Sequence, residues 1–490
     1  MTKIQSVKKN FIMNFILTAT NFIFPIITFP YVSRILLADG TGKVAFATSV
    51  VSYFTTVAAL GIPTYGIRAC ARVRDDEEQL NKTVQELLII HLVTSIIVMI
   101  TFFISVFTVE ELYKEKTLML INSISIILNV LGVNWLYSAL EQYSYITIRS
   151  IVFKLISIVL MFLFIHEKTD YIAYGAITVF ASAGSNLLNF IRLKKLVKFK
   201  KVKKYDLGIH IKPILVFFAQ SIAITVYTNL DTVMLGFMQT DVKVGYYNAA
   251  IKIKTILVSL VTSLGTVLLP RLSFCVQKDD RKQFIDLVTK CFEFVLIVAL
   301  PFTIFFILFA KETLIILSGE SFIGATLAMQ LITPTILFIG LSNITGIQIL
   351  TPLGKEKLVV LSVSAGAIID LIINYIYIPK MGAAGASLGT LIAELIVLCI
   401  QVYFTFEILK EVKRNINLSK ILFANILAII VTIFLIKFID FSIFINLVCY
   451  ALLFFGIYFI LLIILKEKII LEYLRVFVYK FIKGVENEIE

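Results

Sequence analysis

The chain has 490 residues, of which 59% are hydrophobic and only 16% are Asp, Glu, Lys or Arg, and its formal net charge is +13. Soluble globular proteins carry about 25% charged residues, so this composition excludes a protein that dissolves in water. Apolar runs of roughly 20 residues, the length that crosses a bilayer core as a helix, recur along the whole chain. The composition therefore indicates a polytopic membrane protein.

Hydropathy predicts fourteen spans joined by short connections, which gives an all-α fold. The spans must be helices, because open strands and loops leave backbone polar groups unpaired in lipid. The first apolar run lacks a small-residue cleavage site and similar runs follow it, so we interpret it as a span and not as a signal peptide. The predicted spans are 11–33, 44–63, 83–108, 118–140, 148–165, 171–191, 213–236, 245–269, 287–309, 321–350, 358–378, 386–409, 420–437 and 443–465.

The cysteines and histidines show no pattern typical of a metal centre or of a disulfide framework. The cysteines are odd in number, widely spaced and without a CxxC pair, so we expect free thiols that pack as small apolar groups. The histidines are isolated, without metal-ligand spacing, and no cofactor is expected. These residues are Cys70, Cys275, Cys291, Cys399 and Cys449, and His91, His166 and His210.

Lys and Arg are distributed unevenly between the two sides of the predicted bundle. With the N-terminus in the cytoplasm, the cytoplasmic segments carry 33 of the 45 Lys and Arg residues, the opposite side carries nine, and three fall within spans. Positively charged connections stay in the cytoplasm during insertion, so both termini are predicted to be cytoplasmic. Tyrosines near the predicted membrane edges are expected to form aromatic belts: Tyr65, Tyr137, Tyr143 and Tyr145.

The most basic stretch, residues 191–206, holds eight Lys or Arg in the sequence IRLKKLVKFKKVKKYD. It connects the sixth and seventh predicted spans, and no soluble domain surrounds it, so nucleic-acid binding is not favoured. Anchoring of the topology and contact with anionic lipid headgroups explain its charge. The predicted division is an N-terminal six-helix lobe (1–191), a basic linker (192–212), a C-terminal six-helix lobe (213–409), two additional helices (410–465) and an interfacial tail (466–490).

A weak internal repeat relates the two sides of the basic linker. An offset of 207 aligns polar faces of the first and second spans with those of the seventh and eighth, and places Pro63 on Pro270 at the span ends. A competing offset of 203 aligns TGKVAFATS with VGYYNAAIK and places Gly42 on Gly245. Because an even number of spans separates the repeats, the two lobes are predicted to be parallel, with a pseudo-symmetry axis along the membrane normal.

The four aligned spans carry polar faces that lipid would not accommodate cheaply, so we expect them to surround a hydrated central cavity between the lobes. The alternative is that each hydroxyl bonds its own helix or a neighbouring helix. The faces comprise Asn14, Thr18, Asn21 and Thr28; Thr48, Ser52 and Thr55; Ser221, Thr225, Thr228 and Thr232; and Thr255, Ser259 and Thr262.

Four stretches resemble a known family when taken as an ordered set: LGIPTYGIR (60–68), WLYSALEQY (135–143), the region 231–252 and IPKMGAAGASLGT (378–390). They are similar to the Wzx-type polysaccharide flippases of the multidrug/oligosaccharidyl-lipid/polysaccharide exporter superfamily. The resemblance covers the first twelve spans, with the basic linker in its place.

The resemblance implies a transporter and not an enzyme. Its substrate would be an undecaprenyl-diphosphate-linked oligosaccharide, moved to the outer leaflet of a bacterial plasma membrane by alternating access, for capsule, O-antigen or exopolysaccharide assembly. Anionic membrane lipids and other polysaccharide assembly proteins are the expected partners, and two lobes in one chain make a monomer sufficient.

A lipid-linked diphosphate needs cations where water is scarce. Lys252 shares a polar face with Asn248, and Lys154 shares one with Ser157, so both are expected to face the cavity. Snorkelling to the interface is the alternative for Lys252, and anchoring of the topology is the alternative for the arginines at span ends. The candidate substrate-binding residues are Lys252, Lys154, Arg34, Arg68, Arg271, Asn14 and Asn21.

Acidic and amide side chains inside spans suggest ion coupling. Asp370 and Asn374 are separated by one helical turn near mid-membrane, and Asp231 and Glu394 lie within other spans. We predict that Asp231, Asp370 and Asn374 form a cation-coupling site, because clustered oxygens suit Na⁺, and Asp370 can instead carry H⁺. Pairing of these carboxylates with a buried lysine is the alternative.

Two other classes of function compete with the flippase. A multidrug or cation antiporter of the same superfamily would use a smaller pocket, richer in acidic and aromatic residues, without a cluster of cations. A membrane polysaccharide polymerase or ligase would need a large external loop for its catalytic groups, and no external connection in this chain is that long.

Overall fold

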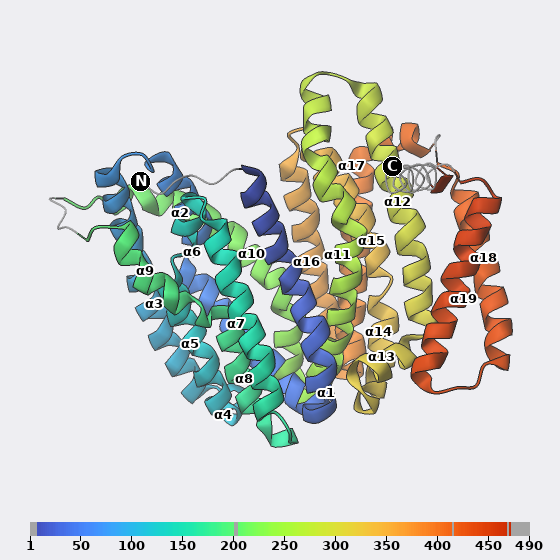
Figure 1. The fold of residues 1–490 in the computed structure, drawn as a ribbon, viewed down its shortest axis with the longest axis horizontal. Helices are drawn as coiled ribbons and strands as arrows, with labels where there is room; N and C mark the ends of the chain where they lie inside the picture. Colours follow the sequence, from blue (N-terminus) through green and yellow to red (C-terminus); the bar gives the residue numbers. More distant parts are fainter. Residues whose placement is uncertain (1–6, 200–203, 414–415, 468–469, 472–490) are drawn as a thin grey trace, which may run out of the picture. The chain divides into compact units, whose positions relative to one another are not determined.

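The computed structural model describes residues 7–199, 204–413, 416–467 and 470–471, which are helical with short connections and contain no strand. Figure 1 shows the helices in chain order, coloured from blue at the N-terminus to red at the C-terminus. The chain forms two compact units, Met1–Asn248 with Ser318–Phe322, and Ala249–Leu317 with Ile323–Glu490. The first unit extends beyond the basic linker and includes the helix that follows it.

The first unit contains helices α1 to α10 and the start of α11. Their bounds are α1 (Val7–Ala59), α2 (Ile62–Arg72), α3 (Glu77–Thr108), α4 (Glu110–Lys114), α5 (Lys116–Gly132), α6 (Asn134–Ala139), α7 (Tyr143–Phe164), η1 (Lys168–Asp170), α8 (Tyr171–Val179), η2 (Phe180–Gly184), α9 (Asn186–Leu196), α10 (Gly208–Met238) and α11 (Asp241–Gln277).

The second unit contains most of α11 and the later helices, except for Ser318–Phe322. Their bounds are α12 (Arg281–Leu308), α13 (Ala310–Ser318), η3 (Glu320–Ala325), α14 (Thr326–Ile332), α15 (Thr335–Ser342), η4 (Asn343–Leu350), α16 (Glu356–Met381), α17 (Ala383–Lys413), α18 (Leu418–Leu435), η5 (Ile436–Phe438) and α19 (Ile443–Ile464). Most of the predicted interfacial tail, residues 466–490, lies outside the described residues.

Thirteen helical runs within the described residues are long and apolar enough to cross a membrane. The first run, Ile12–Arg72, contains both of the first two predicted spans. At ~1.5 Å per residue, the 53 residues of α1 would extend about 80 Å, more than twice the hydrocarbon thickness of ~30 Å. A break at Leu37, with φ 57° and ψ −171°, divides α1 into two segments of membrane length. The predicted connection between the two spans is therefore a kink and not a loop.

The structure corrects two predicted helix ends. Pro63 lies at the first positions of α2, where its missing N–H is tolerated, and does not end the span before it. The preceding chain turns at Leu60 and Gly61, both with positive φ. Pro270 lies inside α11, which continues to Gln277.

A close crossing joins the second half of α1 to the start of α11 within the first unit. A Cβ on Gly42 would lie 1.8 Å from the carbonyl oxygen of Asp241, and a Cβ on Gly245 would lie 2.0 Å from that of Ala38. The offset of 203 relates Ala38 to Asp241 and Gly42 to Gly245. The two contacts, Gly42 with Asp241 and Gly245 with Ala38, are therefore equivalent under the repeat. The same offset places the kink at Leu37 on the break between α10 and α11. The structure therefore favours the offset of 203 over 207 in this region.

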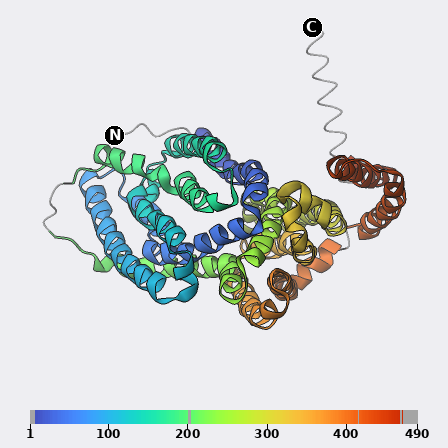
Figure 2. The same ribbon diagram turned by 90° about the horizontal axis from the view of Figure 1, so that it is seen from below.

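Within the first unit, α1 packs against α3, α5, α7 and α10. Figure 2 views these helices close to end-on. Within the second unit, α16 and α17 form an antiparallel hairpin, and α17 also packs on α12, α14 and α15. The additional helices α18 and α19 pair with each other and contact α12 through a phenylalanine-rich cluster that includes Phe305, Phe454 and Phe455.

Substitution of Gly42 by Ala tests the crossing. The added methyl group has no space beside the backbone of α11, so the free energy of unfolding should fall by ~1–3 kcal/mol. A Cβ on Gly456 in α19 would meet no atom within 4 Å, so Gly456→Ala is the matched control and should raise stability by about 0.5–1 kcal/mol. The measurement is the Tm of each variant in detergent. Equal Tm values for the two variants would contradict the close crossing.

Candidate functional site

A line of polar side chains lies exposed on the first half of α1. Asn14, Thr18 and Asn21 are exposed although the segment around them is apolar, and the hydroxyl of Thr18 donates to the carbonyl oxygen of Asn14 at 2.9 Å. Amide side chains at membrane depth are stable against protein or water but not against lipid. This face of α1 is therefore suited to a hydrated space.

Lys154 points at the same face. It lies halfway along α7, partly buried, and its Nζ donates to Oδ1 of Asn21 at 2.5 Å. The structure thus brings together two of the candidate substrate-binding residues that were predicted separately. Within the described residues, the Lys154 ammonium has no carboxylate partner, so its charge is available to an anion.

The packing of α7 on α1 explains this contact. The hydroxyl of Thr147 donates to the carbonyl oxygen of Met13 at 2.9 Å. The hydroxyl of Tyr31 donates to the carbonyl oxygen of Ile165, also at 2.9 Å. Both bonds join residues 134 apart, and Lys154 is 133 residues from Asn21. A nearly constant separation means that the two helices run parallel and in register, so Lys154 is held beside Asn21.

The three arginine candidates lie on different helices. Arg34 is exposed on α1, where its Nη1 donates to the carbonyl oxygen of Pro30 at 2.6 Å, and its side chain lies against Gly319. Arg68 is exposed on α2, and Arg271 is exposed on α11. Lys252 is partly buried on α11 in the second unit. The substrate-binding role expected for Lys252 stays a prediction, as do the roles of the three arginines.

Asp370 and Asn374 lie together, as their spacing predicts. Both are buried on α16 and face Gly389 of α17, where a Cβ would lie 2.2 Å from Oδ1 of Asn374 and 2.7 Å from Oδ1 of Asp370. Because Gly389 has no side chain, the two polar side chains can occupy the space beside its backbone. Glu394 is also buried, further along α17.

Asp231 belongs to the first unit, where it is buried on α10 and accepts a hydrogen bond from the hydroxyl of Tyr247. The predicted cation-coupling site of Asp231, Asp370 and Asn374 is thus divided between the units and stays a prediction. In the part of the chain that the structure describes, no three His, Cys, Asp or Glu side chains are grouped to hold a metal ion.

Several of the polar faces satisfy themselves locally. Thr228, Thr255, Ser259 and Thr262 donate to carbonyl oxygens of their own helices, which was the alternative to a cavity. Thr225 differs, because its hydroxyl lies 2.8 Å from that of Thr56 and links α10 to α1. These hydroxyls therefore carry less functional information than the exposed amides of α1.

A buried arginine on α7 was not predicted from the sequence. Arg149 on α7 is only 6% exposed, and its guanidinium donates to Oδ1 of Asn134 at 2.8 Å, to Oδ1 of Asn186 at 3.2 Å and to the carbonyl oxygen of Ser185 at 2.7 Å. Asn189 donates to Oδ1 of Asn134 at 2.9 Å. This network joins α6, α7 and α9, and its neutral partners make it a structural element of the first unit. Asparagines in spans four and six were the sequence signal that could have indicated it.

One tyrosine beside this network, Tyr137, does not belong to the predicted aromatic belt. Tyr137 is fully buried, stacks on Tyr145 with ring centroids 5.3 Å apart, and donates its hydroxyl to the carbonyl oxygen of Asn189. Arg192 lies over the Tyr145 ring at 4.0 Å. Tyr137 is therefore part of the protein interior, where a buried tyrosine hydroxyl finds a partner.

A second buried cluster joins the linker to the first unit. The carboxylate of Glu86 on α3 lies 2.9 Å from Nε2 of His210 on α10, and Nδ1 of that histidine lies 2.8 Å from the hydroxyl of Tyr65. The backbone N–H of Asp206 donates to Glu86 at 2.7 Å. These contacts fix the end of the basic linker on α2 and α3.

Comparison with known proteins identifies the family. A model described as "Polysaccharide biosynthesis protein" matches residues 7–275, more than half of the chain. The chain belongs to the polysaccharide biosynthesis protein family. This confirms the kind of family that the sequence motifs predicted, and it agrees with a multi-pass membrane protein.

Several proteins of known name or solved structure are similar in sequence or in fold to the present chain. A protein named "Putative O-antigen transporter" from Escherichia coli (strain K12) is 24% identical over 406 residues, which are 81% of this chain and 96% of that protein. The solved structure "Lipid II flippase MurJ, inward closed conformation" has a TM-score of 0.62 at 18% identity, covering 91% of this chain and 99% of that one. The solved structure of an inward-facing multidrug resistance MATE family transporter has a TM-score of 0.60 at 14% identity. The match covers 79% of this chain and 96% of that one. The two structures show the shared fold.

Removal of the Arg149 side chain should destabilise the first unit. Arg149→Met removes the three hydrogen bonds that the guanidinium donates to Asn134, Asn186 and Ser185, and a hydrogen bond to a charged group is worth ~1.5–3 kcal/mol. Arg68→Met, at an exposed arginine, is the matched control and should change the Tm in detergent only slightly. An Arg149→Met protein as stable as the control would contradict a structural role for the network.

Proposed function

We propose that the chain is a flippase that carries an undecaprenyl-diphosphate-linked oligosaccharide across the membrane by alternating access. The observation that carries the proposal is the Lys154–Asn21 pair on an exposed polar face at the middle of membrane-length helices. The family and the sequence relative named as an O-antigen transporter support the same class of substrate.

The chemistry of the pair suits the head of such a substrate. A diphosphate is anionic, and a lysine ammonium without a carboxylate partner is a compact positive charge that binds it through up to three donors. The amides of Asn14 and Asn21 and the hydroxyl of Thr18 offer donors and acceptors of the kind that sugar hydroxyls bind. Charge and neutral polar groups on one face therefore match the two parts of a lipid-linked oligosaccharide.

An antiporter for drugs or cations is the alternative with the same fold. The partly buried Lys154 favours an anionic substrate, because its charge would repel a cationic substrate. A polymerase or ligase is less well supported, since the connections between helices on the predicted outer side are short. The proposed activity is therefore transport without covalent chemistry, in a bacterial plasma membrane with both termini in the cytoplasm.

Ion coupling is the second part of the proposal. Asp370 and Asn374 share one buried position against Gly389, with Glu394 on the same hairpin. Carboxylate and amide oxygens in a buried site suit Na⁺, and Asp370 can alternatively take up H⁺. Binding of either ion at the α16–α17 hairpin is the proposed link to the driving gradient.

Replacement of Lys154 tests the substrate site. A charge-assisted hydrogen bond is worth ~1.5–3 kcal/mol, so Lys154→Ala should reduce export by about 10- to 100-fold. Lys154→Arg, which keeps the charge, should retain part of the activity. The assay is complementation of a strain lacking the gene, scored by accumulation of undecaprenyl-diphosphate-linked repeat units on the cytoplasmic side. Lys355→Ala, at an exposed lysine between η4 and α16, is the control. Export by Lys154→Ala at the control level would remove the substrate-site proposal.

Replacement of Asp370 tests the coupling site separately. Asp370→Asn keeps the size of the side chain but removes its charge and its proton, so transport in proteoliposomes should fall and lose its response to a Na⁺ or H⁺ gradient. Asp286→Asn, at an exposed carboxylate on α12, should leave both unchanged. An Asp370→Asn protein with the ion response of the control would exclude this residue from coupling.

A further inference from the structure

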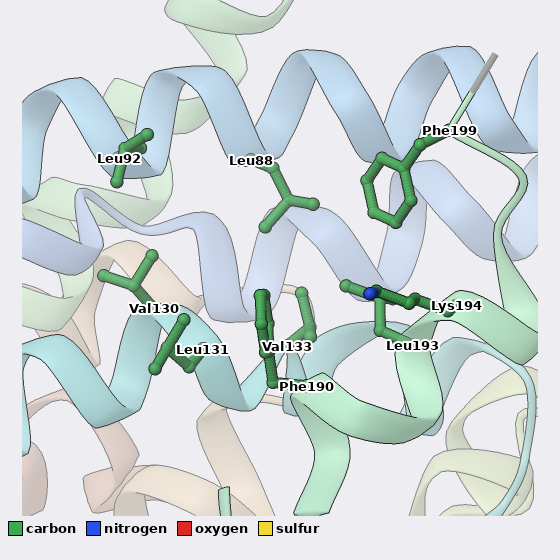
Figure 3. Close-up of a pocket in the computed structure, with 9 residues that line it drawn as sticks. All are labelled: Leu88, Leu92, Val130, Leu131, Val133, Phe190, Leu193, Lys194 and Phe199. Carbon is green, nitrogen blue, oxygen red and sulfur yellow. The ribbon is translucent and has the colours of Figure 1, made fainter. Parts of the chain in front are cut away.

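An apolar cavity of about 460 Å³ lies in the first unit between α3, the end of α5 and α9. Its volume is within the range of roughly 300–1,000 Å³ that is typical of small-molecule sites. Leu88 and Leu92 of α3 form one wall, Val130 and Leu131 of α5 and Phe190 of α9 form the other, and Lys194 is the one polar side chain of its lining within the described residues. Figure 3 shows Leu92 and Val130 at one end and Lys194 and Phe199 at the other. The cavity is thus a slot with a cation at one end.

The cation at the end of the slot is available to a ligand. Lys194 is exposed in the last turn of α9, and it forms no hydrogen bond or ion pair with another described residue. It lies within the basic segment 191–206, so the surrounding charge is also positive. The chemistry at this end therefore favours an anion.

The basic linker itself forms the end wall of the slot. Lys198 is held on α3 by an ion pair with Glu77 at 2.7 Å, and its backbone N–H donates to Asn81 at 2.9 Å. These contacts place the next residue, Phe199, across the slot from Phe190. The slot is therefore built from α3, α5, α9 and the first residues of the basic linker.

The apolar end continues into a surface suited to lipid. Leu92, Val93 and Ile96 on α3 are exposed, as are Leu187 and Ile191 on α9. In a membrane-spanning helix these side chains face acyl chains. A lipid chain can therefore enter the slot sideways from the bilayer, while its headgroup remains at the basic end.

We propose that the slot binds one acyl chain of an anionic glycerophospholipid, with the lipid phosphate on the ammonium of Lys194. The lipid would come from the leaflet on the side predicted to be cytoplasmic. The apolar walls fit the acyl chain, and Lys194 with the basic linker attracts the negative head. Anionic headgroups are attracted to such clusters near the membrane surface.

Occupancy of the slot would stabilise the attachment of the linker to the first unit. Val133 and Leu193, which line the slot, belong to the same apolar cluster as Ile214 of α10. A bound chain would fill the space between α3 and α9 and hold the linker through Lys194 and Phe199. The lipid is therefore a structural ligand, and its binding does not depend on the proposed transport activity.

Lipid binding to the purified full-length protein tests the proposal. Phosphatidylglycerol should bind as a resolved adduct in native mass spectrometry and raise the Tm in detergent, and phosphatidylcholine with the same acyl chains should do so much less. Lys194→Glu should weaken phosphatidylglycerol binding by about tenfold or more, because it replaces attraction by repulsion. Lys195→Glu, at the exposed neighbour outside the slot lining, should have a smaller effect.

Filling the slot gives a second, independent measurement. Leu88→Trp should reduce the number of bound lipids, and Leu92→Trp should do the same if the first variant is unstable, because Leu92 is more exposed. Ile104→Trp, at an exposed residue of α3 outside the slot lining and its entry surface, should bind lipid as the unchanged protein does. Equal binding of the two lipid classes, equal effects at Lys194 and Lys195, or displacement of phosphatidylglycerol by undecaprenyl diphosphate would overturn the assignment to a phospholipid.

Discussion

Polar groups at membrane depth need either a protein partner or water, and the first unit uses both solutions within two turns of α7. Arg149 has its guanidinium bonded to amide and carbonyl oxygens and is closed off from solvent. Lys154, five residues later, points at an exposed asparagine on α1. Since lipid would not accommodate either charged group without partners, Arg149 is structural, and we propose that the position of Lys154 is hydrated.

The parallel packing of α1 and α7 makes this division possible. Hydrogen bonds from Thr147 and Tyr31 hold the two helices in register at both ends, so the polar face of α1 stays beside Lys154. The buried arginine network then ties α7 to α6 and α9. A rigid wall therefore carries the candidate binding groups, and this is what a transporter needs if whole units move around a substrate.

The sequence predicted the spans well because the length of an apolar helix is a local property, and nearly all expected spans lie within observed helices. It predicted that Asp370 and Asn374 lie together for the same reason, because residues four apart lie on the same face of a helix. The kink at Leu37 was not predictable from hydropathy, because the residues around it remain helical. Arg149, Tyr137 and the Glu86–His210 pair were missed because their partners are distant in sequence, and hydropathy cannot distinguish a buried polar group from one at a membrane edge.

The central claim is that the face of α1 beside Lys154 is hydrated, and the reactivity of a cysteine at Asn21 tests it most directly. In a protein whose five native cysteines are replaced, a charged thiol reagent should label Asn21→Cys in membranes and should not label Ile104→Cys, because Ile104 is 58% exposed on α3 but faces lipid. Prior addition of a lipid-linked oligosaccharide should slow the labelling at Asn21. An Asn21→Cys protein as unreactive as Ile104→Cys would contradict the hydrated face and the site built on it.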